Sequence, residues 1–332
     1  MHASQSGGHP HRRRAQIGVF GAEAHSCALS TENVEMGPYP KRVTAALLGW
    51  RPRATAVGAF REPMYVIAVA SQKGGVGKTT ISLNLGLALA RAGHRALILE
   101  LDAQGSLGLS LGLADRARPG VAELLTGAER LEAVLLRTRD PQLQVLTVGR
   151  VDPTTVSGFE EALARGPVLP SVIARLAPDF ELVVMDCPAG LGKVTTRALE
   201  IATHVLLPLQ AEPLALRSVG QMLALIDRVR AEKNPRLSVL GMVLSMFDRQ
   251  ASASLEVAET LWTKFPDGII LDTVVPRDEA FLEASLRGAP LLLMQKRPPP
   301  LARIFDQLAN DVLVRLEPAS AEDDDDPIPL LV

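Results

Sequence analysis

The stretch Lys73-Gly74-Gly75-Val76-Gly77-Lys78-Thr79-Thr80 follows an apolar run at residues 65–70 and precedes a helical pattern that begins at Thr79. Backbone N–H groups of a Gly-rich loop at the N-terminus of a helix can approach phosphate oxygens closely. Lys78 adds a positive charge for the terminal phosphates, and the Thr79 hydroxyl can bind Mg²⁺. The common G-x-x-x-x-G-K-[ST] spacing would place a glycine where this chain has Gln72. Because strand, loop and helix follow in the required order, the sequence predicts a nucleotide-binding P-loop.

Outside this loop, short apolar runs alternate with longer helical patterns. The expected strands cover residues 65–70, 96–101, 143–148, 181–186, 203–208, 238–244 and 269–274. The expected helices cover about residues 79–92, 120–137, 159–176, 193–200, 215–232, 253–264, 278–287 and 300–315. Continuous apolar strands that alternate with helices indicate a parallel sheet covered on both faces. The expected fold is therefore a single doubly wound α/β domain, with a mostly parallel sheet flanked by helices.

The two ends of the 332-residue chain differ in composition from its middle. Residues 1–63 show no sustained helix or strand period and carry 8 basic and 4 acidic residues, whereas residues 317–332 carry 6 acidic residues and no basic ones. We expect a disordered leader at 1–63, the folded domain at 64–316 and a disordered acidic tail at 317–332. Met64 is then a candidate start of the native protein. The sequence has only two cysteines, which suits a reducing compartment. It has no apolar run close to the ~20 residues that are needed to cross a bilayer. We therefore expect a cytoplasmic protein.

The P-loop stretch resembles the deviant Walker A motif of the ParA/MinD group of partition and positioning ATPases. The resemblance covers about residues 65–315, and it implies a P-loop fold, ATP and Mg²⁺ as ligands, and slow, partner-stimulated ATP hydrolysis. It also implies a homodimer that forms with ATP, in which Lys73 reaches the ATP bound by the partner subunit. Relatives with an iron–sulfur cluster need cysteines downstream of Cys187, and the sequence has none there. Cys187 itself is expected to be a small buried residue.

Two carboxylates follow expected strands and fit the same family. A carboxylate at a strand end beside a P-loop is well placed for Mg²⁺ or for the attacking water. Residues 100–104 resemble the D-x-D-P-Q switch, with Glu100 in place of the first Asp, which implies that Asp102 orients the water. Asp186 ends an apolar strand as a Walker B carboxylate does, and such a carboxylate reaches Mg²⁺, usually through water. The expected catalytic residues are Lys73, Lys78 and Asp102, and the expected metal-binding residues are Thr79, Asp102 and Asp186.

Three segments of the C-terminal half resemble the ParA branch in particular. They cover residues 206–216, 243–248 and 274–285. In the family, parts of the last two segments line the adenine pocket. The resemblance therefore places Met246, Phe247, Pro276 and Arg277 beside the adenine of the bound nucleotide.

ParA ATPases bind DNA non-specifically, and phosphate contacts of this kind require clusters of Lys and Arg. The candidates are Arg228, Arg230, Lys233 and Arg236 on and after one helix, with Arg249, Arg277 and Arg287 on loops. A solvated surface explains each of these charges equally well, and the acidic residues Asp278 and Glu279 weigh against DNA contact.

MinD-like membrane targeting needs a basic amphipathic C-terminal helix, which the prolines and the four aspartates of the tail exclude.

The preferred interpretation is a ParA-type ATPase switch that partitions a chromosome or plasmid or positions another cargo. Its ATP dimer would bind DNA non-specifically, associate with the nucleoid, and respond to a ParB-like or other stimulating protein. The alternative is a MinD-like or other positioning or regulatory ATPase that recognises a protein partner and not DNA. A metabolic P-loop enzyme, such as a small-molecule kinase or synthetase, would need a second substrate pocket, for which the sequence offers no residues.

Overall fold

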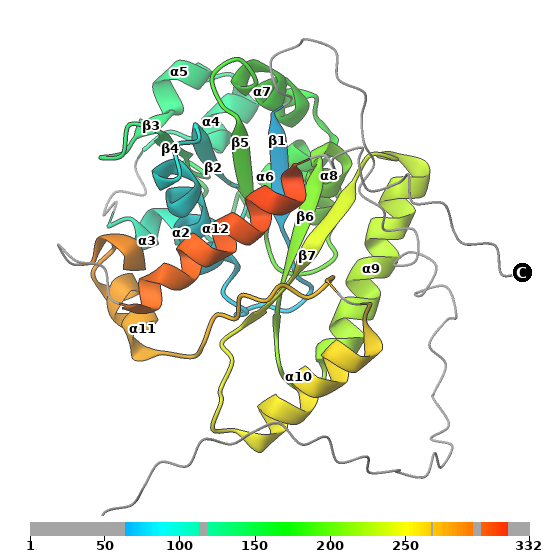
Figure 1. Cartoon of the computed structure of the whole chain (residues 1–332). Coiled ribbons are helices and arrows are strands. Elements are labelled where there is room, and N and C mark those ends of the chain that lie inside the picture. The colour runs from blue at the N-terminus through cyan, green and yellow to red at the C-terminus, as the bar shows by residue number, and fades with distance from the viewer. Residues whose placement is uncertain (1–63, 113–117, 267, 295–299, 318–332) are drawn as a thin grey trace, which may run out of the picture. The chain divides into compact units, whose positions relative to one another are not determined.

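A seven-stranded sheet forms the centre of the computed structural model (Figure 1). The structure describes residues 64–112, 118–266, 268–294 and 300–317, so the expected leader and all but the first residue of the expected tail lie outside the described residues. The strands are β1 (Tyr65–Val69), β2 (Ala96–Glu100), β3 (Leu136–Arg137), β4 (Leu143–Leu146), β5 (Leu182–Asp186), β6 (His204–Gln210) and β7 (Ser238–Ser245). Their order is β3-β4-β2-β5-β1-β6-β7, and each neighbouring pair is parallel except β3 with β4. The expected doubly wound, mostly parallel α/β fold is confirmed.

The middle of the sheet consists of strands that are buried along nearly their whole length. β1 pairs with β5 on one side and with β6 on the other, and β5 also pairs with β2. In this register, Asp186 lies beside Val69 in β1 and beside Glu100 in β2. Since parallel strands end at the same edge of a sheet, the loops that follow β1, β2 and β5 meet there, and this edge carries the candidate site.

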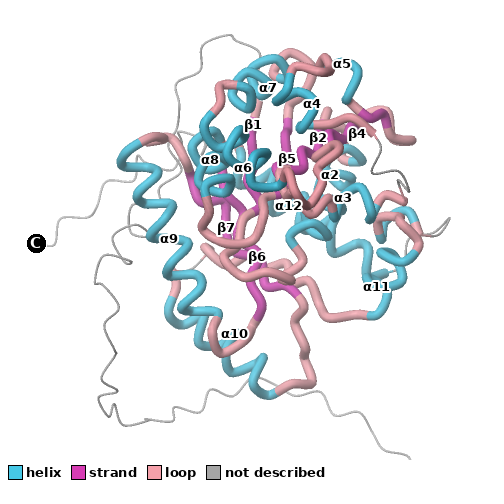
Figure 2. Tube along the Cα trace, turned by 180° about the vertical axis from the view of Figure 1, so that it is seen from behind, coloured by secondary structure: helices cyan, strands magenta, loops and turns pink. Residues whose placement is uncertain are grey.

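Helices cover both faces of the sheet, because successive strand residues point to opposite faces. In β1, Val66 and Ala68 belong to one hydrophobic cluster, whereas Ile67 and Val69 belong to another. The second cluster includes side chains of α2 (Lys78–Arg91) and α12 (Arg303–Leu316), in front of the sheet in Figure 1. The first includes side chains of α6 (Val156–Arg165), α8 (Lys193–Ile201) and α9 (Ala215–Glu232), and Figure 2 shows α6 and α8 on the opposite face. The other α-helices described are α3 (Ser106–Ser110), α4 (Val121–Thr126), α5 (Leu131–Val134), α7 (Val168–Leu176), α10 (Ser252–Lys264) and α11 (Glu279–Leu286).

Two of the expected helices are divided in the structure. The pattern at 120–137 becomes α4, α5 and β3, because Gly127 adopts a left-handed conformation (φ 72°) that ends α4. The pattern at 159–176 becomes α6 and α7, with the break at Gly166 and Pro167. Proline can precede or begin a helix, but it cannot continue one without loss of a hydrogen bond.

The expected strand at 269–274 is wrong. The structure assigns isolated bridges to this part of the chain, between Met242 and Ile270 and between Phe247 and Pro276. Between the two bridges, the side chain of Thr273 turns to α12 and donates a hydrogen bond to Asp311 Oδ2 at 2.6 Å. The backbone bonds explain the interruption: Leu271 N–H donates to the carbonyl oxygen of Met242 and Val275 N–H to that of Leu244, so the segment has two more residues than β7 between these bonds.

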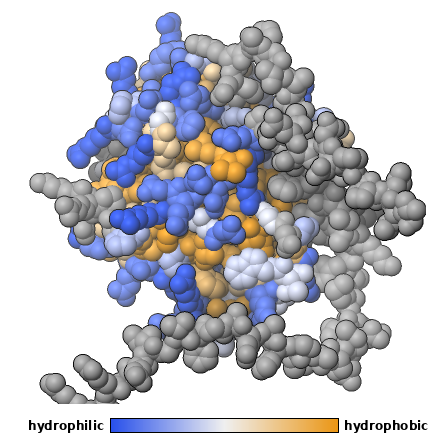
Figure 3. All heavy atoms as spheres, viewed as in Figure 1, coloured by the Kyte–Doolittle hydropathy of each residue, from blue (hydrophilic) through white to orange (hydrophobic). Residues whose placement is uncertain are grey.

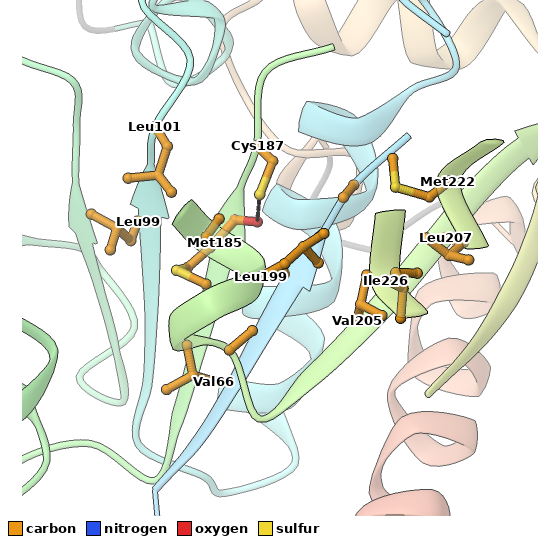
Figure 4. Close-up of a cluster of buried hydrophobic side chains, with 14 of the residues drawn as sticks. Val66, Leu99, Leu101, Met185, Cys187, Leu199, Val205, Leu207, Met222 and Ile226 are labelled. Atoms are coloured by element: carbon orange, nitrogen blue, oxygen red, sulfur yellow. Dashed lines mark hydrogen bonds between the residues drawn. The ribbon is translucent and has the colours of Figure 1, made fainter. Parts of the chain in front are cut away.

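Cys187 lies inside the hydrophobic cluster between β5, β1 and α8 (Figure 4). The side chain is 1% exposed, and its Sγ lies 3.7 Å from the carbonyl oxygen of Met185. Burial raises the pKa of the thiol, so the sulfur remains protonated and unreactive at neutral pH. The expectation of a small buried residue is confirmed.

The face that carries α12 presents hydrophilic and hydrophobic residues side by side (Figure 3). α12 buries Phe305, Leu308 and Val312 toward the sheet and exposes Val314. Within the described residues, no helix is both long enough and apolar enough to cross a membrane.

Candidate functional site

The P-loop connects β1 to α2 at the edge where the parallel strands end. Gly75 and Gly77 adopt left-handed backbone conformations, with φ of 74° and 82°, which residues with a Cβ rarely adopt. Gly77 is also the N-cap of α2, and it brings no side-chain acceptor to the first N–H groups of this helix. Those N–H groups remain available to an anion such as a phosphate. The loop therefore has the backbone donors that the predicted nucleotide site requires.

Contacts from neighbouring loops and strands hold the P-loop in place. Ser245 Oγ, at the end of β7, donates to the carbonyl oxygen of Val76 at 2.8 Å. Gly190 N–H, in the loop after β5, donates to the carbonyl oxygen of Ser71 at 3.1 Å. In the second half of the loop, Val76 and Lys78 are buried, and Lys78 is only 7% exposed. A buried, bonded loop of this kind needs little reorganisation when a ligand binds.

Asp186 lies at the end of β5 and is fully buried. Ser82 Oγ donates to its Oδ1 at 3.1 Å, whereas its buried Oδ2 accepts no hydrogen bond from the described residues. Burial raises the pKa of Asp186 to about 6, and the hydroxyls of Thr79 and Ser82 and the charge of Lys78 act in the opposite direction. A carboxylate oxygen without a donor, near a threonine hydroxyl, suits Mg²⁺, which prefers oxygen ligands and keeps several waters. Asp186 and Thr79 therefore fit a Mg²⁺ site.

The raised pKa of Asp186 predicts that Asp186→Asn stabilises the nucleotide-free protein while it weakens Mg²⁺-dependent activity. The folded-state pKa is above the unfolded value of 3.8, so ionisation of Asp186 opposes folding. This cost is absent below pH 4, grows as the pH rises to about 6, and is complete above it, at roughly 2–3 kcal/mol. We expect the Asn variant to melt higher than the wild type at pH 7.5 in EDTA, and at a similar temperature at pH 4. A lower melting temperature at pH 7.5 would contradict this account.

Asp102 lies two residues after the end of β2, in the loop that leads to α3. Its Oδ1 accepts a hydrogen bond from Gln104 N–H at 2.9 Å, and its carbonyl oxygen accepts one from Gly105 N–H at 3.0 Å. The Asp102 carboxyl lies close enough to raise the pKa of Asp186, by repulsion between the two charges. The structure thus brings Lys78, Asp102 and Asp186 together at one edge of the sheet, as expected.

Glu100, the neighbour of Asp102 in the switch segment, is fully buried at the end of β2. Its Oε1 accepts the N–H of Leu107 at 2.7 Å, and its Oε2 accepts the N–H of Val148 at 3.0 Å. Burial raises the pKa of Glu100 to about 7, against the effect of these two hydrogen bonds. Both oxygens of Glu100 are therefore engaged by backbone donors.

Lys73 is half-exposed at the start of the P-loop, and its side chain turns to the end of β6. Its ammonium group donates to Gln210 Oε1 at 3.0 Å and forms an ion pair with Glu212 of the same chain. Nearby, Gln72 donates to Gln221 Oε1 of α9. The contact that the family resemblance implies for Lys73, with the ATP of a partner subunit, stays a prediction, and it requires that Lys73 leave Glu212.

The residues expected around the adenine come from two segments that the structure joins. Phe247 N–H donates to the carbonyl oxygen of Val275 at 3.1 Å, and Arg277 N–H donates to the carbonyl oxygen of Phe247 at 3.0 Å. Met246 has a positive φ of 49°, unusual for a residue other than glycine, and its sulfur accepts a hydrogen bond from Gln210 at 3.1 Å. The pairing places all four candidates next to the P-loop edge of the sheet, while adenine binding itself stays a prediction.

The seven DNA candidates do not form one patch. Arg228, Arg230, Lys233 and Arg236 lie at the C-terminal end of α9 and before β7, where the parallel strands begin, which is the edge opposite the P-loop. Arg249 and Arg277 follow the end of β7 and the segment beside it, on the P-loop side. Arg287 forms an ion pair with Glu283. Asp278, which weighed against DNA contact, is the N-cap of α11 and accepts the N–H of Ala280 at 2.8 Å.

Several residues of the site carried no assigned role in the sequence analysis. Ser82 contacts Asp186 from the second turn of α2, Ser245 holds the P-loop, and Gln210 and Glu212 bind Lys73. Residues 210 and 212 belong to a segment that resembles the family, which could have drawn attention to them. The two serines gave no signal, because a hydroxyl at the end of a strand or inside a helix is common.

Comparison with known proteins identifies relatives of this chain. The family model described as "AAA domain" matches residues 64–239. The chain is 37% identical over 239 residues to the chromosome partitioning protein ParA of Caulobacter vibrioides, with 70% of this chain and 87% of that protein covered. It is 36% identical over 255 residues to the chromosome-partitioning ATPase Soj of Thermus thermophilus, with 76% and 97% covered.

A solved structure also matches this chain along most of its length. The cobyrinic acid a,c-diamide synthase of Mycobacterium smegmatis, crystallised with ADP and magnesium, is 32% identical to this chain and superposes with a TM-score of 0.61. The match covers 75% of this chain and 94% of the synthase. A protein that is named for a biosynthetic reaction therefore resembles this chain in fold and sequence, as the partition proteins do in sequence.

Proposed function

We propose a nucleotide-switch function for this chain, which belongs to the ParA/Soj family of chromosome-partitioning ATPases. In this proposal, the protein binds and hydrolyses ATP in order to partition DNA or to position another cargo in the cell. One observation carries the proposal: Lys78, Asp102 and the buried Asp186 converge beside a loop whose first lysine, Lys73, remains half-exposed. A site with an exposed cation at its rim is suited to completion by a second subunit.

Each residue of the site would have its own role in ATP binding and hydrolysis. The P-loop N–H groups and Lys78 would hold the phosphates, Thr79 and Asp186 would hold Mg²⁺, and Asp102 would orient the attacking water. Mg²⁺, when bound, neutralises charge on the β- and γ-phosphate oxygens. Among the described residues, no group of three or more His, Cys, Asp or Glu side chains could hold a metal alone. Oxygens of the phosphates and of water would complete the coordination of Mg²⁺.

The dimer and its partners belong to the same proposal. ATP would close two subunits face to face, with each Lys73 released from Glu212 and directed to the partner's nucleotide, and hydrolysis would open them. We propose non-specific DNA as the surface bound by the ATP dimer, so that the protein is cytoplasmic and nucleoid-associated, with a ParB-like protein as the stimulating partner. Residues 64–316 would form the ATPase domain that performs this cycle.

Retention on non-specific DNA, compared between ATP and ADP, tests the proposal. The wild type should be retained with ATP and Mg²⁺ but not with ADP, and retention should fall steeply as salt rises, because phosphate contacts release counterions. Arg249→Ala and Arg277→Ala test the P-loop side, and Arg228→Ala with Lys233→Ala tests the opposite edge. Arg137→Ala, on the edge strand β3, is the matched basic control.

The alternative is a positioning or regulatory ATPase of this family that recognises a protein and not DNA. The acidic surroundings of two DNA candidates favour it: Arg287 is paired with Glu283, and Arg277 precedes Asp278 and Glu279. If the wild type ignores DNA in ATP at low salt, this alternative replaces DNA binding. High turnover that depends on a small metabolite would instead indicate a biosynthetic role, of the kind for which the synthase is named.

A further inference from the structure

A single buried side chain closes the loop that carries Asp102. Glu100 lies at one end of this loop, and its Oε1 accepts the N–H of Leu107, in the first turn of α3, at 2.7 Å. Asp102 lies inside the closed segment, where its own hydrogen bonds go to Gln104 and Gly105. The two ends of the segment are therefore fixed to each other through one carboxylate.

The second oxygen of Glu100 ties this loop to the part of the sheet next to it. Glu100 Oε2 accepts the N–H of Val148, 48 residues away in the chain. Val148 is itself held, because its carbonyl oxygen accepts the N–H of Ala122 in α4 at 2.9 Å, and the carbonyl oxygen of Thr147 accepts that of Val121 at 3.0 Å. The loop is thus anchored to a segment that β4 and α4 already fix.

Packing does not provide the same restraint on the outer side of the loop. A cavity of about 260 Å³ lies there, lined in part by Ala103, Gln104 and Gly105 and by Glu100 itself. Buried leucines hold both ends of the segment in the core, but the residues between them that border the cavity lack neighbours on that side, so hydrogen bonds contribute to where this part of the loop sits. The carboxylate of Glu100 supplies two of these bonds, and a carboxylate that accepts backbone N–H groups makes strong, directional contacts.

We propose that Glu100 is a positioning residue for ATP hydrolysis, which holds Asp102 at the distance from the P-loop that hydrolysis requires. Glu100 acts through the loop and contacts no reacting atom. The longer side chain is what permits this arrangement here, because an aspartate, one CH₂ shorter, would not reach both N–H groups in this backbone. A displacement of about 1 Å of a catalytic group can lower a rate by as much as a hundredfold, so a clamp of this kind affects turnover more than binding.

Steady-state hydrolysis and nucleotide affinity, measured on the full chain, test the proposal. Glu100→Gln keeps the size of the side chain but presents an amide NH₂ to one of the two N–H donors, and Glu100→Asp keeps the charge but shortens the reach. We expect kcat to fall by roughly tenfold or more in both variants. The affinity for a fluorescent ATP analogue should change by less than twofold, because the P-loop is unchanged. The Leu107 and Val148 amides should lose protection from hydrogen exchange.

Glu181→Gln is the matched control. Glu181 also accepts a backbone N–H, that of Arg95 at 3.3 Å, but it lies just before β5, where the parallel strands begin, and it touches neither the Asp102 loop nor the segment that anchors it. Its replacement should lower stability without change in kcat. A folded Glu100→Gln variant with kcat within twofold of the wild type would overturn the proposal, as would an equal loss of kcat in both Gln variants. The inference rests on the proposed ATP hydrolysis. If the wild type does not hydrolyse ATP in this assay, the result counts against that function. The ratio of kcat in the Glu100 variants to kcat in the wild type tests the role of Glu100.

Discussion

Replacement of Lys78 by alanine is expected to abolish ATP binding and, with it, hydrolysis. The ammonium group of Lys78 is buried at the N-terminus of α2, and its charge lowers the pKa of the buried Asp186. Without it, the phosphates would face an uncompensated carboxylate. Removal of a preorganised charge of this kind lowers catalysis by a factor on the order of 100 to 1,000, and loss of nucleotide affinity adds to this. Titration with a fluorescent ATP analogue and a phosphate-release assay measure the two effects.

The chain offers a closely matched control for this variant. Lys193 is the first residue of α8 and follows Gly192, as Lys78 is the first residue of α2 and follows Gly77. Lys193 is exposed, however, and pairs with Glu161 on α6. Lys193→Ala should bind and hydrolyse ATP as the wild type does. Nucleotide affinity of Lys78→Ala within twofold of the wild type would remove the P-loop from the proposed mechanism.

The features that the sequence predicted well are those that depend on neighbours in the chain. The P-loop requires glycines and a lysine in one short stretch between a strand and a helix, and two of its glycines, Gly75 and Gly77, adopt left-handed backbone conformations. Asp102 and Asp186 follow apolar runs, and parallel pairing then brings strand ends together at one edge. A local sequence pattern, combined with the rule that parallel strands end at one edge of the sheet, was sufficient to predict where these residues lie.

The features that the sequence could not predict depend on contacts between distant residues. Glu100 bonds to Val148, and Lys73 pairs with Glu212 139 residues away, and no spacing rule indicates either contact. The segment at 269–274 is apolar enough for a strand, but it has two more residues than β7 between its bonds to Met242 and Leu244, and this irregular pairing depends on contacts that the sequence does not show. The helix breaks at Gly127 and at Gly166-Pro167 were readable in principle, because glycine and proline are common at helix ends, yet the helical period continued through them.

Asp102→Ala is expected to separate ATP binding from hydrolysis. Asp102 is only partly buried and makes its side-chain hydrogen bond to the nearby Gln104 N–H, so its truncation leaves Glu100, Lys78 and the P-loop in place. Nucleotide affinity should therefore stay within a few-fold of the wild type. The rate of hydrolysis should fall by a factor on the order of 100 or more, as is typical when a group that orients or deprotonates the nucleophile is lost.

The same variant tests the switch, because a protein that binds ATP without hydrolysing it should remain in its ATP-bound form. With ATP and Mg²⁺, Asp102→Ala should elute as a dimer in size-exclusion chromatography and should stay on DNA longer than the wild type, whereas Lys78→Ala should do neither. Asp140→Ala is the matched control, because Asp140 Oδ1 likewise accepts the N–H two residues ahead, at 3.0 Å, but in the loop between β3 and β4. If Asp102→Ala hydrolyses ATP as fast as Asp140→Ala, the attacking water must be oriented by another group. If it binds ATP without hydrolysis and yet stays monomeric, the output of the cycle is not subunit closure, and the exposed Lys73 has a role within its own chain.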